Sequence, residues 1–65
     1  MTIKEHRESS KMTQKELADV VGVKRSSVAM WESGISYPRV EVLIKLSEHF
    51  GCTIDELVRG EKNES

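Results

Sequence analysis

The chain has 65 residues, one cysteine and a formal net charge of −1, which divides into +2 over residues 1–39 and −3 over the rest. A chain of this length forms one small domain that buries only about 60% of its extended surface. It contains no apolar run long enough to span a membrane, its first ten residues lack the apolar segment of a secretory signal, and its single cysteine fits the reducing cytoplasm. We therefore expect a cytoplasmic domain without membrane spans or disulfides.

Apolar spacing predicts helices along the first half of the chain and no strand. The first helix is expected over about residues 3–10. The second begins after Thr13 and ends at Gly22, where the turn needs a positive φ. The third is expected to begin at about residue 25 and to end just before Gly34.

The second half of the chain is expected to hold two further helices. Pro38 suits the first turn of the fourth helix, because the N–H that proline lacks has no helical partner there. One stripe along this helix, mostly apolar, is expected to consist of Val40, Leu43, Leu46, Ser47 and Phe50. Thr53 begins a short fifth helix that Gly60 ends, so residues 1–60 form the folded domain and residues 61–65 a polar tail, expected to be disordered.

The predicted helices differ in how they begin. Three of them begin with the capping box Thr-x-x-Glu, at Thr2, Thr13 and Thr53. The third helix instead begins with Lys24 and Arg25, although a cation at this end opposes the helix dipole and costs about 0.3–1 kcal/mol. The two cations either face solvent without a role or hold an anion, which would offset that cost because the free amides and both side chains favour negative charge.

The second and third helices share a spacing that can be read physically: Gln14-x3-Ala18-x3-Gly22-x5-Val28-x2-Trp31. The small Ala18 allows two helices to cross closely, and Gly22 allows a tight turn between them. Val28 and Trp31 are then expected to pack the third helix against the second. Two helices joined in this way cross at a steep angle and leave the third helix projecting from the surface.

The segment TQKELADVVGVKRSSVAMWESG resembles the helix-turn-helix of the Cro and phage-repressor (XRE-like) DNA-binding proteins, and the likeness extends over about residues 2–60. The resemblance implies an all-α fold, a compact five-helix bundle of the lambda-repressor-like type, with the second and third helices as the helix-turn-helix. It also implies a sequence-specific double-stranded DNA-binding transcriptional regulator, a repressor, that reads the major groove with residues 25–32.

The resemblance also assigns roles to individual positions. Relatives point side chains at base edges from the positions of Arg25, Ser26 and Met30. They hold phosphates from the positions of Gln14, Lys24, Ser27 and Arg39, and Tyr37 is a weaker candidate of this kind. Two roles stay open: Arg25 can donate to guanine or clamp a phosphate, and Met30 can pack on a thymine methyl or fill space beside Trp31.

Four further positions matter for stability. Arg7 and Glu32 match a pair that relatives bring together, which we interpret as a structural ion pair. Lys11 stands in a turn where relatives usually have glycine, so a left-handed backbone there would cost about 1 kcal/mol. His6 replaces an apolar residue common in the first helix, and together with Lys11 it predicts a loose first helix.

The sequence offers little for catalysis or metal binding. His49 and Cys52 have helical spacing, but two ligands separated by Gly51 fall short of a zinc site. No nucleophile–histidine–acid arrangement and no glycine-rich phosphate loop is present. We therefore expect no enzyme activity, no metal and no cofactor.

The expected partner is double-stranded DNA with inverted-repeat half-sites, bound by a homodimer that forms at least on DNA. A surface from the end of the fourth helix through the fifth is the candidate dimer contact (Val42, His49, Cys52 and Glu56). The alternative is a protein-interaction module of the same fold, an antitoxin or antirepressor, whose exposed apolar residues would matter more than Arg25 (Val20, Ile35, Val40 and Val42).

Overall fold

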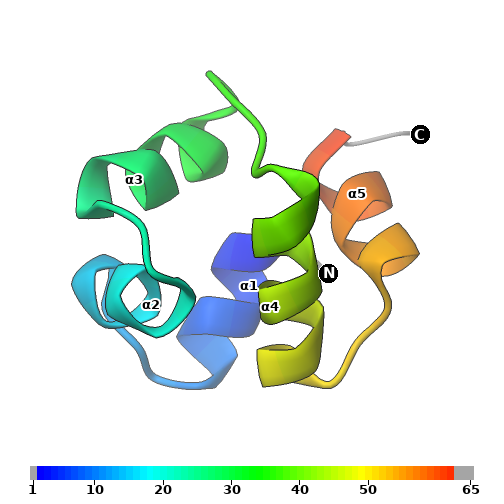
Figure 1. Ribbon diagram of the computed structural model, residues 1–65, viewed down its shortest axis with the longest axis horizontal. Helices are drawn as coiled ribbons and strands as arrows, with labels where there is room; N and C mark the ends of the chain where they lie inside the picture. The colour runs from blue at the N-terminus through cyan, green and yellow to red at the C-terminus, as the bar shows by residue number, and fades with distance from the viewer. Residues whose placement is uncertain (1, 63–65) are drawn as a thin grey trace.

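The computed structural model describes the backbone of residues 2–62 and the side chains of residues 2–59. Figure 1 shows five helices in chain order, which are α1 (Ile3–Ser9), α2 (Gln14–Val21), α3 (Arg25–Ser33), α4 (Val40–Phe50) and α5 (Ile54–Lys62). The described residues contain no strand, so the predicted all-α class is confirmed. None of their helices has the length and apolar character needed to cross a membrane.

Local hydrogen bonds explain where three helices begin. At α1 and α2 the threonine side chain accepts from the third helical amide while the glutamate side chain accepts from the threonine amide, so both capping boxes of Thr2 and Thr13 are complete. At α5 the Glu56 amide donates to Thr53 Oγ1 over 3.1 Å. α5 then continues past Gly60, where the sequence predicted its end, and the predicted tail falls outside the described residues from 63 onward.

The start of α4 differs from the prediction. Pro38 lies outside the helix, because Arg39 is the N-cap, with extended backbone at φ −70° and ψ 164°, and the first helical residue is Val40. The buried Pro38 ring belongs to the connection that leads into α4. Val40 is 66% exposed and does not join the predicted apolar stripe, which begins one turn later at Leu43.

One apolar core joins all five helices. It is formed by nine buried side chains: Ile3, Leu17, Ala18, Val21, Val28, Trp31, Leu43, Leu46 and Leu57. Trp31 belongs to this core, as the sequence predicted, and is 5% exposed. Since its members come from every helix, no helix buries its apolar side without the others.

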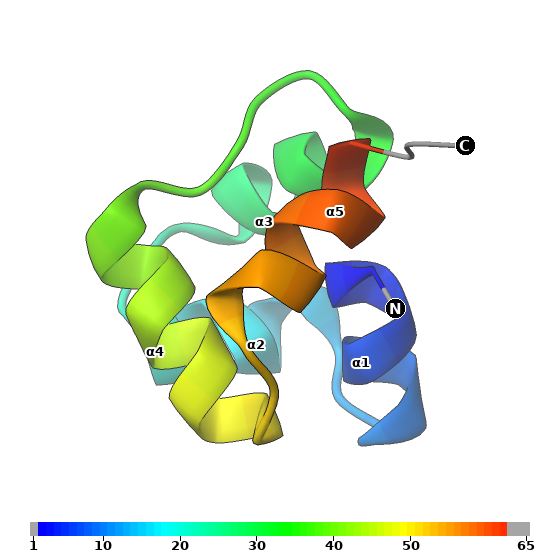
Figure 2. The same cartoon turned by 90° about the vertical axis from the view of Figure 1, so that its right-hand side faces the viewer.

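The turn between α2 and α3 sets how α3 sits. Gly22 adopts φ +75°, and the Val23 amide donates to the Ala18 carbonyl over 2.9 Å. Lys45 Nζ of α4 lies 3.9 Å from where a Gly22 Cβ would stand, which places a cation beside the carboxyl end of α2. α2 and α3 pack together more extensively than other helix pairs, and Figure 2 shows the connection after α3 arching over to α4.

The turn after α1 has a strained backbone. Lys11 has φ +58°, so the condition under which the sequence attached a cost to this lysine is met. Within α1, the His6 ring stacks on Phe50 with centroids 5.0 Å apart, while its Nε2 atom is buried without a hydrogen-bond partner. Both features cost stability in the part of the chain that the sequence predicted to be loose.

Candidate nucleic-acid interface

Helix α3 presents the predicted recognition residues to solvent. Lys24, Arg25 and Ser26 are exposed at its start, and Met30 is 38% exposed one turn further along. The opposite side of the helix, with Val28, is buried in the core. The helix is therefore held from one side only, and its other side is available to enter a groove.

The amino end of α3 has unused hydrogen-bond donors. Lys24 is the N-cap and its side chain makes no capping hydrogen bond. The Ser27 amide donates to the Lys24 carbonyl over 2.9 Å, but in the described part of the chain the amides of Arg25 and Ser26 have no such acceptor. Two cations and two free amides therefore meet at one exposed helix end, which favours an anion.

A chain of hydrogen bonds links the core side of the domain to Arg25. Arg7 Nε donates to Glu32 Oε2 over 2.6 Å, and Arg7 Nη2 donates to Glu32 Oε1 over 3.1 Å. Gln14 Nε2 donates to the same Oε1 over 2.9 Å, and Arg25 Nη1 donates to Gln14 Oε1 over 3.1 Å. Gln14 stands at the first residue of α2, as predicted, but its side chain is already bonded at both ends. It connects the predicted ion pair to the predicted base-reading arginine, a link that the sequence did not indicate.

The ion pair is largely shielded from water. The side chains of Arg7 and Glu32 are 12% and 6% exposed. Burial raises the pKa of Glu32, but hydrogen bonds from Arg7 and Gln14 outweigh it, so the net effect is a lowered pKa. The hydrogen bond to Glu32 likewise raises the pKa of Arg7. Both groups are thus held in their charged forms, and Arg7 Nη1 also donates to the Met12 carbonyl over 2.8 Å.

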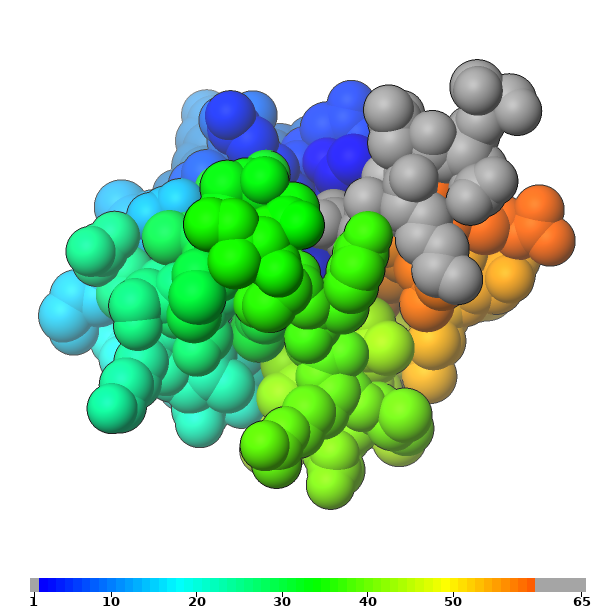
Figure 3. Space-filling view, turned by 90° about the horizontal axis from the view of Figure 1, so that it is seen from above, coloured from blue at the N-terminus to red at the C-terminus, as the bar shows by residue number. Residues whose placement is uncertain are grey.

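A second helix end without a cap lies beside α3. Arg39 is the N-cap of α4 and, like Lys24, makes no side-chain capping bond. Figure 3 shows that α3, the connection after it and the start of α4 form one continuous face. The sequence could have indicated that α4 begins without a cap, since Arg39 stands where a capping Ser, Thr, Asp or Asn would be favourable. This was missed because Pro38 was placed inside the helix, so Arg39 was not considered as the N-cap.

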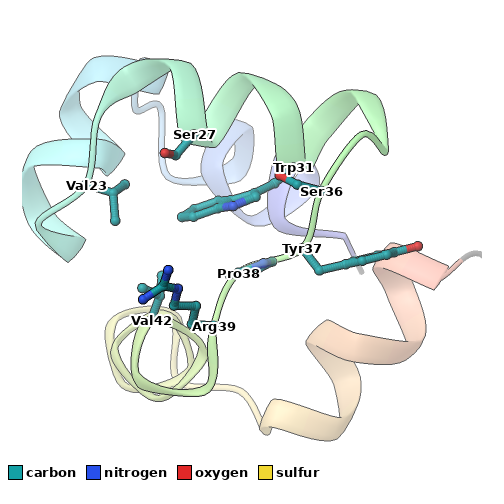
Figure 4. A pocket seen from close by; sticks show the side chains of 8 residues that line it. All are labelled: Val23, Ser27, Trp31, Ser36, Tyr37, Pro38, Arg39 and Val42. Carbon is teal, nitrogen blue, oxygen red and sulfur yellow. The ribbon is translucent and has the colours of Figure 1, made fainter.

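Between these two helix ends lies a pocket of about 210 Å³. Figure 4 shows the side chains that line it: Val23, Ser27, Trp31, Ser36, Tyr37, Pro38, Arg39 and Val42. Three of the predicted phosphate-binding residues, Ser27, Tyr37 and Arg39, therefore meet at one site. Lys24 lies at the amino end of α3, while Gln14 belongs to the hydrogen-bond chain.

The remaining candidates lie away from this face or make no site. Val42 is half-buried and lines the pocket, so it does not belong to an exposed surface for a partner protein, unlike the exposed Val20 and Ile35. Burial and the nearby Glu56 raise the pKa of the Cys52 thiol. No group of three metal-binding side chains occurs among the residues with described side chains.

Comparisons with known proteins point to one family. The helix-turn-helix family profile matches residues 3–57. The chain is 43% identical over 56 residues to the HTH-type transcriptional activator BcrR of Enterococcus faecalis, covering 86% of this chain and 28% of BcrR. It is 42% identical over 45 residues to the HTH-type transcriptional regulator AnsR of Bacillus subtilis, covering 69% and 39%.

A phage protein is among the relatives. The chain is 36% identical over 61 residues to the cryptic phage CTXphi transcriptional repressor RstR of Vibrio cholerae, covering 88% of this chain and 54% of RstR. The chain thus spans about a quarter to a half of the length of these relatives. No solved structure matches it.

Proposed function

Because the chain belongs to the helix-turn-helix family, we propose that it is a sequence-specific double-stranded DNA-binding transcriptional regulator. The observation that carries this proposal is the exposed start of α3, where Lys24 and Arg25 stand at an uncapped helix end held outward by a buried core side. An anion there offsets the unfavourable dipole interaction that these cations create in the free protein.

In this proposal α3 enters the major groove and its three outward residues contact base edges (Arg25, Ser26 and Met30). Arg25 donates to guanine O6 and N7, and its bond to Gln14 orients the guanidinium before DNA arrives. Lys24 and the residues around the pocket hold phosphates on either side (Ser27, Tyr37 and Arg39). Gln14 contributes its helix-end backbone amide to a phosphate, because its side chain is engaged with Arg25 and Glu32.

We further propose that two copies bind an inverted repeat, in the cytoplasm and associated with the nucleoid. Helix-turn-helix dimers place half-sites about 34–36 Å apart, and the longest extent of this domain is 30 Å, so two copies fit side by side on one face of the duplex. Repression is the simplest outcome, because a domain lodged in the groove excludes other proteins from that DNA, whereas activation also requires a contact with polymerase.

Selection of bound sequences from random duplex DNA at a stated salt concentration tests the proposal directly. An enriched inverted repeat would support both sequence specificity and twofold binding. Recovery of unrelated sequences would leave only the nonspecific electrostatic component and would contradict the proposal.

Two substitutions at neighbouring residues separate base reading from phosphate binding. Arg25→Ala is expected to lower affinity for the selected sequence by about 1–3 kcal/mol and to relax preference at one base pair, whereas Lys24→Ala is expected to weaken all duplexes alike. Competition binding with the selected and a scrambled duplex measures both effects. If neither substitution changes DNA affinity, the protein-interaction alternative is favoured.

A further inference from the structure

We propose that the indole N–H of Trp31 donates a hydrogen bond to a DNA phosphate, which sits in the pocket between α3 and the start of α4. This inference rests on the proposed DNA-binding function and deepens it. It gives a ligand contact to a side chain that the sequence assigned to the core alone.

The first observation is an unused donor on a buried side chain. Trp31 is 5% exposed, yet in the described part of the chain its Nε1 makes no hydrogen bond, although a buried tryptophan N–H usually finds a partner. Among the described side chains only His6 Nε2 is both sealed from solvent and unpartnered, so the indole nitrogen still reaches solvent. In Figure 4 the Trp31 ring forms one wall of the pocket, and Pro38 and Arg39 lie on the facing wall.

The second observation is the uncapped end of α4 on the facing wall. Arg39 provides no capping bond, and no acceptor is present in the described residues for the amides of Val40, Glu41 and Val42. The helix is 11 residues long, so its dipole favours an anion at this end. The exposed Glu41 in the first turn opposes that preference, whereas the Arg39 side chain beside it supports it.

The pocket has room for a small anion. Its volume of about 210 Å³ lies below the range of about 300–1,000 Å³ that encloses drug-sized ligands. Ser27 lines it from α3, the helix proposed to enter the groove, so an anion in the pocket lies next to the DNA-facing surface. A backbone phosphodiester therefore fits better than a free metabolite, and it would receive donors from both helices at once.

The test combines a protein change with a DNA change. Trp31→Phe keeps an aromatic ring but removes the donor, and it is expected to weaken binding to the selected duplex about 5- to 10-fold. Methylphosphonate substitution then neutralises one phosphate at a time. At one phosphate position the methylphosphonate should lower the affinity of the wild-type protein but leave the affinity of Trp31→Phe almost unchanged. The reason is that the methylphosphonate and the substitution remove the same contact.

A matched variant separates the donor from the shape of the pocket. Val23→Ala alters an apolar wall of the same pocket without removing a donor, and it is expected to keep the sensitivity to that methylphosphonate. Thermal melts of both variants show that they fold. The proposal is wrong if Trp31→Phe binds DNA like the wild type, or if its loss of affinity adds to the loss caused by every methylphosphonate. It is also wrong if Val23→Ala, like Trp31→Phe, makes binding insensitive to that methylphosphonate.

An experiment on the unaltered protein covers the case in which Trp31→Phe fails to fold. Trp31 is the single tryptophan, so its indole N–H gives one assignable nitrogen–proton NMR signal. The selected duplex should shift this signal and slow its exchange with water. A signal that stays unchanged while the Arg25 amide shifts would overturn the proposal but leave DNA binding intact. A response to inorganic phosphate without one to the duplex would overturn the phosphodiester as the ligand.

Discussion

Glu32 is the residue on which most polar contacts of the interface converge. It accepts from Arg7 and Gln14, and through Gln14 it reaches Arg25. Removing the carboxylate would leave the Arg7 guanidinium without its ion-pair partner in a site shielded from water. We therefore expect Glu32→Ala to cost about 3–5 kcal/mol of unfolding free energy, which a denaturant titration measures.

The same residue predicts how stability depends on pH. The pKa of Glu32 is lowered in the folded protein, so its contribution to stability is full above the unfolded value and is lost as the pH falls through the folded value. The free energy of unfolding should therefore fall as the pH is lowered from about 5 to about 3. Denaturant titrations at several pH values should show a smaller fall for Glu32→Gln than for the wild type, and an equal fall would contradict this role. The same titrations on Glu5→Gln give the comparison at an exposed site, because the pKa of Glu5 is also lowered, by its hydrogen bonds with Thr2.

Lys11 shows how a single backbone angle limits stability. Its φ of +58° is unfavourable for any residue with a Cβ, whereas glycine adopts it readily. Lys11→Gly is therefore expected to raise the unfolding free energy by up to about 1 kcal/mol, or the melting temperature by about 4–8 °C for a domain of this size. Lys4→Gly, within α1, should instead lower it by about 1 kcal/mol. If both substitutions destabilise equally, the turn at Lys11 is not strained.

At the scale of the helices, the domain contains two kinds of amino end. α1 and α2 begin with complete capping boxes, whereas α3 and α4 begin with Lys24 and Arg39 and have no side-chain cap. The two uncapped ends lie on the same side of the molecule, beside the pocket. Capping residues there would favour folding, so their absence at both ends fits a surface that binds phosphates.

This division predicts opposite effects on stability and binding. Lys24→Ser supplies a cap to α3 and should raise the unfolding free energy by about 0.5–2 kcal/mol while weakening DNA binding. Thr53→Ala removes a cap from α5, which makes none of the proposed DNA contacts, and should lower stability by a similar amount without changing affinity for an isolated half-site, which one copy binds. Melting curves and binding titrations on the same samples measure both quantities. A Lys24→Ser protein that is less stable, or that binds DNA unchanged, would contradict the interpretation.

At the scale of the whole molecule, binding depends on where charge lies and not on its total. The chain has a net charge of −1, yet the exposed cations Lys24 and Arg25 stand at the start of α3 and the exposed Arg39 at the start of α4. Figure 3 shows α3 and the start of α4 on one face of the molecule. The proposed dimer surface is smaller than the sequence suggested, because Val42 lines the pocket and only the residues further along remain for it. We therefore expect weak association in the free protein and pairing on DNA.

Two measurements check this expectation. Sedimentation should show two copies on an inverted repeat and one copy on an isolated half-site. The logarithm of the binding constant should fall linearly with the logarithm of the salt concentration, with a slope smaller by about 1 after Lys24→Ala. A stable dimer without DNA, or a slope that Lys24→Ala leaves unchanged, would contradict this arrangement.

Much of the fold follows from interactions between residues close together in the sequence. Capping boxes need partners three residues apart, apolar stripes repeat within one helix, and Gly22 and Lys11 each set a turn by their own backbone angle. The five helices, the buried Trp31 and the Arg7–Glu32 pair could therefore be expected, the pair through its resemblance to relatives. The boundaries predicted at Pro38 and Gly60 were wrong, because either residue type can stand inside a helix or beside its end.

By itself the sequence determined an all-helical domain with an exposed cationic helix end, because these features depend on local spacing and local charge. Only the tertiary structure decided which side chains meet between helices. In the folded chain the Gln14 side chain bonds to both Glu32 and Arg25, Val42 lines the pocket, and the Trp31 ring lies across that pocket from the start of α4. Such contacts join residues far apart in the chain, so they depend on how the helices cross, which no short stretch of sequence specifies.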